Sequence, residues 1–157
     1  MRRRDINKTF SKEGITFEYP GDWFEVPAGA DKLLNGYAHE IGVLIPPINY
    51  GNVIIQKYNL QYLGVNSVQE DWSKTIDWMK KDNITIIMQN TTTVNGLTIY
   101  KMINSGYEPA YNGTQKMLYV EVGKDQNVYI IQLYSESSSF DSYLSVFNQV
   151  VSTIKIK

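Results

Sequence analysis

An Asn95-Gly96 dipeptide between two long runs of strand-forming residues is the feature that most constrains the fold of this chain. Residues 84–94 precede the dipeptide and residues 97–107 follow it. Asn-Gly is the strongest short-range signal for a two-residue hairpin, because both residues accept the positive φ that a type I′ turn requires. The segment therefore predicts two neighbouring antiparallel strands.

Other segments predict further strands of the same kind. Ile15, Phe17 and Tyr19 alternate with polar residues before a Pro-Gly-Asp turn, as expected of a strand with one buried face. Five more strands are expected, at residues 23–26, 39–45, 53–63, 115–122 and 128–135. Both faces of the last run are largely apolar, which predicts a central strand that is covered on both sides.

Two helices are indicated by apolar residues that recur with helical spacing. The first begins at a capping-box pattern, Ser67-x-x-Glu70, and its apolar stripe consists of Val68, Trp72, Ile76 and Met79. The second begins near Ser138-x-x-Asp141, which resembles another N-terminal cap. Its stripe consists of Phe140, Leu144, Phe147, Val151 and Ile154.

These elements predict an α+β fold in which an antiparallel β-sheet is flanked by helices. Hairpin connections argue against an alternating βαβ order, and each helix must bury its apolar stripe against a face of the sheet. At 157 residues the chain has the size of one domain. We expect a flexible N-terminal arm over residues 1–12 and a single α+β domain over residues 13–157.

The composition excludes several classes of function. There is no cysteine, so disulfides, thiolate metal sites and cysteine nucleophiles are absent. Fifteen basic and sixteen acidic side chains give a net charge of −1, which is too balanced for electrostatic binding of nucleic acid. No run approaches eighteen apolar residues, so we expect no membrane span within this chain.

Few residues have the chemistry of a catalytic or metal site. His39 is the single histidine, and an isolated strand histidine is more often structural than catalytic. Glu70, Asp71 and Asp77 cluster on the first helix, where capping and the helix dipole explain the first two. Residues 135–139 (SESSS) could present backbone amides to an anion, although self-capping is the simpler interpretation. We therefore expect no catalytic residue, no cofactor and no metal.

Aromatic residues are the positive signal for binding. Trp78 lies off the apolar stripe of its helix, and Tyr107 and Tyr111 flank a proline-containing loop. Exposed Trp and Tyr provide a large contact area with a polar group attached, so these three are candidate contacts for a protein or glycan partner. The alternative is packing at the edge of the core.

Four Asn-x-Ser/Thr sequons provide possible glycosylation sites, at Asn7, Asn83, Asn90 and Asn112. Their presence is consistent with a cell-surface protein, but strands and turns rich in Asn and Thr would also produce them. A basic Arg2-Arg3-Arg4 start is not followed by an apolar segment. We expect either a cytoplasmic protein or an extracytoplasmic one whose signal or anchor lay upstream.

Two stretches resemble the PsbP-like proteins. Residues 10–26 contain the aromatic strand, the Tyr-Pro turn and the Trp of that family at Phe17, Tyr19, Pro20 and Trp23. Residues 140–156 are similar to its last helix and terminal strand, although this chain has Ser152-Thr153-Ile154 where the family often has Ser-Phe. The resemblance implies an α/β/α sandwich. The family includes an extrinsic subunit of photosystem II, prokaryotic lipoproteins and, by fold similarity, a Ran-binding nuclear import factor.

Two hypotheses for function follow. The first is a non-enzymatic accessory or binding domain, tethered at a cell surface, that binds a protein or another partner. The second is a cytoplasmic small-ligand carrier, or an enzyme that uses carboxylates and tyrosine hydroxyls. The missing catalytic motifs favour the first.

Overall fold

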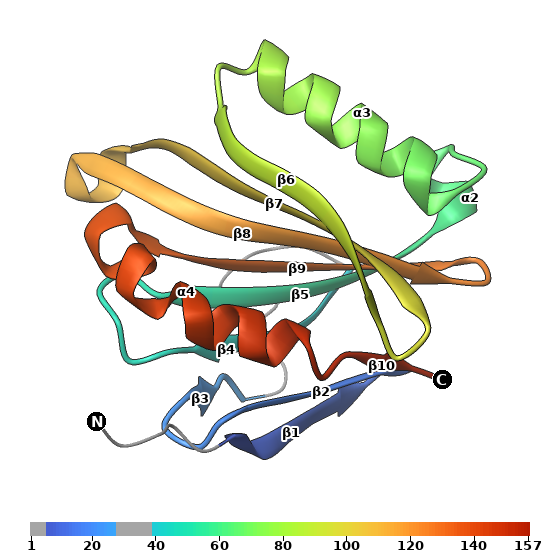
Figure 1. The fold of residues 1–157 in the computed structure, drawn as a ribbon, viewed down its shortest axis with the longest axis horizontal. Coiled ribbons are helices and arrows are strands. Elements are labelled where there is room, and N and C mark those ends of the chain that lie inside the picture. Colours follow the sequence, from blue (N-terminus) through green and yellow to red (C-terminus); the bar gives the residue numbers. More distant parts are fainter. Residues whose placement is uncertain (1–5, 28–38) are drawn as a thin grey trace.

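A computed structural model of the chain describes residues 6–27 and 39–157, and these form two antiparallel sheets and two long helices (Figure 1). The large sheet has seven strands, in the order β3 (Phe24–Glu25), β4 (Glu40–Ile45), β5 (Asn52–Asn59), β9 (Asn127–Glu136), β8 (Gly113–Lys124), β7 (Leu97–Glu108) and β6 (Thr85–Val94). The small sheet has three, in the order β1 (Ile6–Lys12), β2 (Ile15–Pro20) and β10 (Lys155–Ile156).

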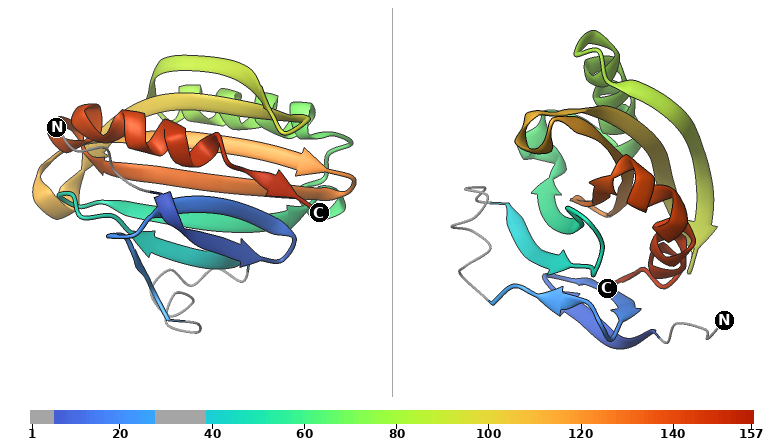
Figure 2. Two further views of the ribbon diagram at one scale, coloured as in Figure 1. Left: turned by 60° about the horizontal axis from the view of Figure 1, so that its bottom comes forward. Right: turned by 90° about the vertical axis from the view of Figure 1, so that its left-hand side faces the viewer.

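The two long helices cover opposite faces of the large sheet, which gives the predicted α/β/α sandwich. Residues 128–133 demonstrate this: Tyr129, Ile131 and Leu133 join the core under α4 (Ser137–Val151), whereas Val128 and Ile130 join the core under α3 (Val68–Lys81). The prediction of a central strand covered on both faces is therefore confirmed. Figure 2 shows the large sheet curving around α4, with the small sheet beside it.

The local signals in the sequence are also confirmed. Asn95 and Gly96 have φ of 49° and 79° and join β6 to β7, with Val94 paired to Leu97. The Ser67 hydroxyl accepts a hydrogen bond from the Glu70 amide at 3.1 Å, as the capping box predicts. The Glu70 carboxylate in turn accepts from the Asn66 amide at 2.7 Å, one residue earlier than in the standard box.

The prediction of a flexible arm over residues 1–12 is wrong for its second half. Residues 6–12 form β1, which pairs with β2 through a Glu13-Gly14 turn whose φ values are both positive, 52° and 94°. The glycine is a signal for this turn. Phe10 stacks on Phe17 with ring centroids 4.9 Å apart, so burial of an aromatic pair holds the strand in place. Residues 1–5, including the three arginines, lie outside the described part.

Two further boundaries differ from the sequence prediction. The strand expected over residues 53–63 ends at Asn59, because the Asn59 side chain accepts from the Gln61 amide and starts a one-turn helix, α2 (Leu60–Leu63). The second helix begins at Ser137 without a side-chain cap. Ser138 instead donates to Glu136, and Asp141 pairs with Lys116 at 2.8 Å.

The core beneath α4 contains a buried hydrogen bond between the N-terminal and C-terminal parts of the chain. The Trp23 indole donates to the Tyr143 hydroxyl at 2.8 Å, and Trp23 is 1% exposed. Tyr143→Phe removes the acceptor and leaves the buried N–H without it. We expect a loss of about 1–3 kcal/mol in the free energy of unfolding, measured by urea denaturation. Tyr62→Phe, at a side chain that is 66% exposed, is the control and should change stability by less than about 0.5 kcal/mol.

Candidate functional site

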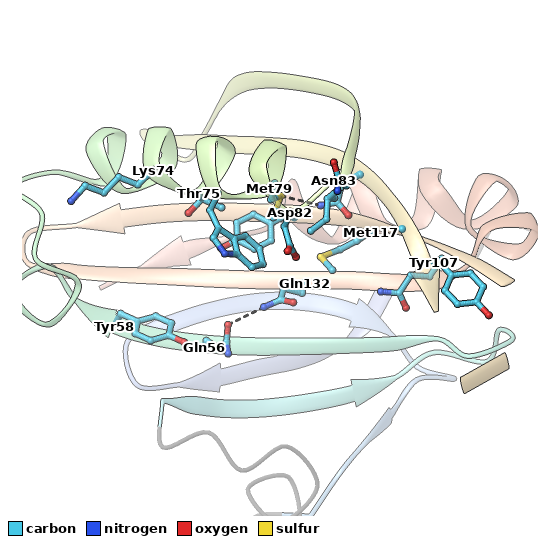
Figure 3. Close-up of a pocket in the computed structure, with 16 residues that line it drawn as sticks. Gln56, Tyr58, Lys74, Thr75, Met79, Asp82, Asn83, Tyr107, Met117 and Gln132 are labelled. Carbon is cyan, nitrogen blue, oxygen red and sulfur yellow. Dashed lines mark hydrogen bonds between the residues drawn. The ribbon is translucent and has the colours of Figure 1, made fainter. Parts of the chain in front are cut away.

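Helix α3 covers only part of its face of the large sheet, and the uncovered part forms a cleft. The apolar stripe of α3 packs on Met102, Tyr119 and Ile130. Between α3 and β5 lies a cleft of about 800 Å³, shown in Figure 3. This volume is in the range of about 300–1,000 Å³ that is typical of ligand sites.

A second hollow, of about 570 Å³, continues the cleft toward the 3₁₀ helix η1 (Pro109–Tyr111). The two hollows share four lining residues, namely Gln56, Gln115, Met117 and Gln132. Because they share these residues, we treat them as one site and call it the α3-face groove. It crosses β5, β9 and β8, which lie side by side in the sheet.

Side-chain amides lie on the floor of the groove among isoleucine, methionine and tyrosine side chains. Gln132 donates to the Gln56 carbonyl across β9 and β5 at 3.0 Å, and Asn52 donates to the Tyr134 hydroxyl at 3.0 Å. Asn104 is 5% exposed and donates to the Met79 sulfur at 3.6 Å. Each primary amide has two N–H donors and a carbonyl acceptor, so one bond leaves capacity for others.

Exposed aromatic rings stand at the rim. Trp78 from α3 is 57% exposed and Tyr107 from β7 is 63% exposed, and both line the larger hollow. Tyr107 lies toward the opposite end of the cleft from Tyr58 in Figure 3, and its hydroxyl donates to the Asn112 side chain. The structure therefore brings together two of the three aromatic residues singled out from the sequence. Tyr111 belongs to η1, and its side chain lies outside the described part.

A buried pair of acids lies beneath the N-terminal half of α3, outside the groove lining. Glu121 of β8 is fully buried and faces Asp71, which is 9% exposed. Burial, together with the neighbouring Asp71 carboxyl, raises the pKa of Glu121 to about 9. Burial also raises the pKa of the adjacent Tyr119 hydroxyl. Glu121 is therefore a neutral acid at pH 7.

This pair adds to the sequence interpretation of Asp71, which explained the residue by capping and the helix dipole alone, because Asp71 is also buried against Glu121. Glu121 was missed altogether, although a signal existed: it is the one charged residue in the apolar run Leu118–Val122. The other acids of the first helix behave as expected, since Glu70 caps the helix and Asp77 is exposed.

The remaining candidates from the sequence show no catalytic arrangement in the part of the chain that the structure describes. His39 is half-buried and packs against the rings of Tyr58 and Tyr62, at centroid distances of 4.7 Å and 4.4 Å. No cluster of three or more His, Asp or Glu suited to a metal occurs among residues 6–27 and 39–157. Within the same residues, none of the helices combines the length and apolarity that crossing a membrane requires.

The four sequons differ in their structural surroundings. Asn83, Asn90 and Asn112 are exposed, with Asn83 two residues after the end of α3 and Asn90 in the edge strand β6. Asn83 and Asn112 have positive φ, 59° and 49°, which explains asparagine at these turns without reference to glycosylation. Asn7 lies in β1, and its side chain is outside the described part.

Solved structures with the same fold have little sequence in common with this chain. The cyanobacterial PsbP (CyanoP) from Synechocystis sp. PCC 6803 superposes with a TM-score of 0.63 at 14% identity, covering 96% of this chain and 92% of that one. Protein PA94 of Pseudomonas aeruginosa gives 0.62 at 11% identity, covering 96% of each chain. LpqN of Mycobacterium tuberculosis gives 0.58 at 13% identity, covering 96% and 90%.

These likenesses confirm the PsbP-like fold that the sequence resemblance implied. No family model matches the sequence, and neither does any curated protein. At 11–14% identity the likeness carries the fold alone, so function must be argued from the residues of this chain.

Proposed function

We propose that the chain is a non-enzymatic binding domain that holds its partner in the α3-face groove. The observation that carries this proposal is the pair of exposed rings, Trp78 and Tyr107, at the rim of a cleft that is also lined by several side-chain amides. Exposed aromatic side chains at a concave site are typical of binding surfaces, because they bury a large area at low entropic cost.

The alternative of a carboxylate enzyme has less support. Glu121, whose pKa is strongly raised, is sealed beneath α3 and does not line the groove. The acids that do line it, Asp82 and Glu108, belong to different hollows. A general acid must reach its substrate within hydrogen-bond distance, which Glu121 does not do. A cytoplasmic small-ligand carrier would use the same groove, and it differs from our proposal in the size of the ligand and in its location.

A surface location is the second part of the proposal. Three sequons are exposed, and LpqN, which shares the fold, is described as involved in cell envelope biogenesis. Expression in a secretory host followed by glycosidase treatment tests whether the sequons are used. A mass decrease that disappears in an Asn83/Asn90/Asn112→Gln variant supports the proposal, and an unmodified protein counts against it.

The test of binding is a capture experiment with matched variants. The Trp78→Ala/Tyr107→Ala double variant should keep its thermal stability, because both rings are more than half exposed, yet lose most of its partner captured from the native membrane fraction. Phe24→Ala is the control: Phe24 is 59% exposed and lies on β3, away from the groove. Equal capture by all three proteins would refute the assignment of the site, and unfolding of the double variant would show that the rings are structural.

A further inference from the structure

Resting on the proposed function, we propose that the ligand of the α3-face groove is a neutral oligosaccharide. Its sugar rings stack against Trp78 and Tyr107, and its hydroxyls bind the amides of Gln56, Gln115 and Gln132. Three properties of the described lining residues lead to this class of ligand: the charge, the hydrogen-bonding groups and the state of the backbone beneath them.

The lining is nearly free of charge. Among the described lining residues of both hollows, the charged ones are Lys74, Asp82 and Glu108, one cation and two anions. A site for phosphate, sulfate or a uronic acid needs a concentration of Arg or Lys, and a site for a cationic ligand needs several carboxylates. The groove has neither, so its ligand is uncharged.

The hydrogen-bonding groups of the groove both donate and accept. Amides supply both functions, and so do the hydroxyls of Thr75, Tyr119 and Tyr134 that line it. Sugar hydroxyls have the same dual character, and neighbouring hydroxyls on one ring match the donor and acceptor of one primary amide. A surface with this chemistry binds a polyhydroxylated chain without requiring a formal charge on either side.

The backbone beneath the groove disfavours an extended peptide. Strands β5, β9 and β8 each have neighbours on both sides, so their N–H and C=O groups are already used in the sheet. Peptide segments that bind sheets do so chiefly by adding a strand at an open edge. The groove lies on a face instead of an edge, and only side chains are available to a ligand there.

The two joined hollows and the two rim rings also suit a chain of sugars better than one. Trp78 and Tyr107 come from α3 and β7, and the smaller hollow extends the site toward η1. The C–H faces of a pyranose are apolar and pack on aromatic rings, while its equatorial hydroxyls point sideways to the amides. One ring would leave part of this surface unoccupied.

Tryptophan fluorescence of the purified protein tests the proposal directly. The chain has three tryptophans, of which Trp23 and Trp72 are buried and Trp78 is exposed. Titration with maltohexaose, cellohexaose and chitohexaose should give a saturable emission change with at least one of them. Because the ligand is neutral, the affinity should be nearly the same at about 0.05 M and 1 M NaCl.

Variants then locate the site. Trp78→Phe should keep binding, measured by calorimetry, whereas Trp78→Ala and Gln115→Ala should each weaken it by roughly tenfold. Phe24→Ala should leave the affinity unchanged.

Two other ligands serve as comparators, a heparin hexasaccharide as the charged one and a decaproline peptide as the peptide. Tighter binding of either comparator than of the neutral sugars overturns the assignment. So does a failure of all three neutral sugars to bind at millimolar concentration. If none of the sugars binds while the Trp78→Ala/Tyr107→Ala variant still loses its partner from the membrane fraction, the proposed class of ligand is wrong and the proposed location of the binding site is retained.

Discussion

Replacing Phe147 with aspartate is expected to abolish the cooperative unfolding transition. Phe147 is fully buried on α4 and contacts three aromatic rings, with centroids 6.0 Å away at Trp23, 5.7 Å at Phe140 and 5.4 Å at Tyr143. Removing the ring alone costs about 3–5 kcal/mol, and the carboxylate must in addition be desolvated without a partner. Together these costs approach the whole stability of a small domain, about 5–15 kcal/mol.

Circular dichroism during heating measures this effect. Two further aspartate variants on α4, at less buried positions, should have smaller effects. Leu144 is only half-buried, so Leu144→Asp should lower the melting temperature without eliminating the transition. Ser145 is exposed on the same helix, and Ser145→Asp should have almost no effect. A sharp transition in the Phe147→Asp protein would mean that α4 does not pack on the sheet as described.

Glu121→Gln is expected to stabilise the protein at alkaline pH and to remove the pH dependence of stability that Glu121 causes. Between the unfolded pKa of 4.5 and the folded value of about 9, the unfolded state has lost the proton of Glu121 while the folded state retains it. The folded state therefore loses stability as the pH rises through this window, by at most about 1.4 kcal/mol per pH unit. Below pH 4.5 both states are protonated and the effect disappears. Glutamine has no proton to lose and preserves the shape of the side chain.

Urea denaturation at several pH values between 5 and 9 measures the slope. The variant should be more stable than the natural chain by up to about 5 kcal/mol at pH 8.5, and similar to it near pH 4.5. Asp71→Asn should narrow the pH window over which stability falls, because Asp71 contributes to the raised pKa of Glu121. Glu18→Gln changes an exposed acid and serves as the control. Parallel curves for the natural chain and Glu121→Gln would contradict a neutral buried acid.

The local elements of the fold were readable from the sequence because their causes are local. The Asn95-Gly96 turn and the helix stripes depend on residues at most a few positions apart. The division of the strands into two sheets was not readable. It depends on β10 pairing with β2, residues about as far apart as the chain permits, and a two-residue strand has no pattern of its own.

The α3-face groove could likewise be predicted from the sequence only in part. Trp78 and Tyr107 were selected from the sequence as exposed aromatic residues, and the structure places both on one cleft. The amide floor was not predicted, because Gln56 and Gln132 are 76 residues apart and meet only through the pairing of β5 with β9. Alternation in a strand shows which residues share a face, whereas the lateral order of strands decides which faces become neighbours.

The closing of the small sheet by β10 has a consequence for how the chain reaches its native state. Thr16 and Ile15 of β2 pair with Lys155 and Ile156, and the Gly14 carbonyl accepts from the Lys157 amide. During synthesis the β1–β2 hairpin leaves the ribosome long before the strand that completes it. The edge of β2 that later pairs with β10 therefore stays unpaired, and able to pair with other chains, until β10 has been synthesised.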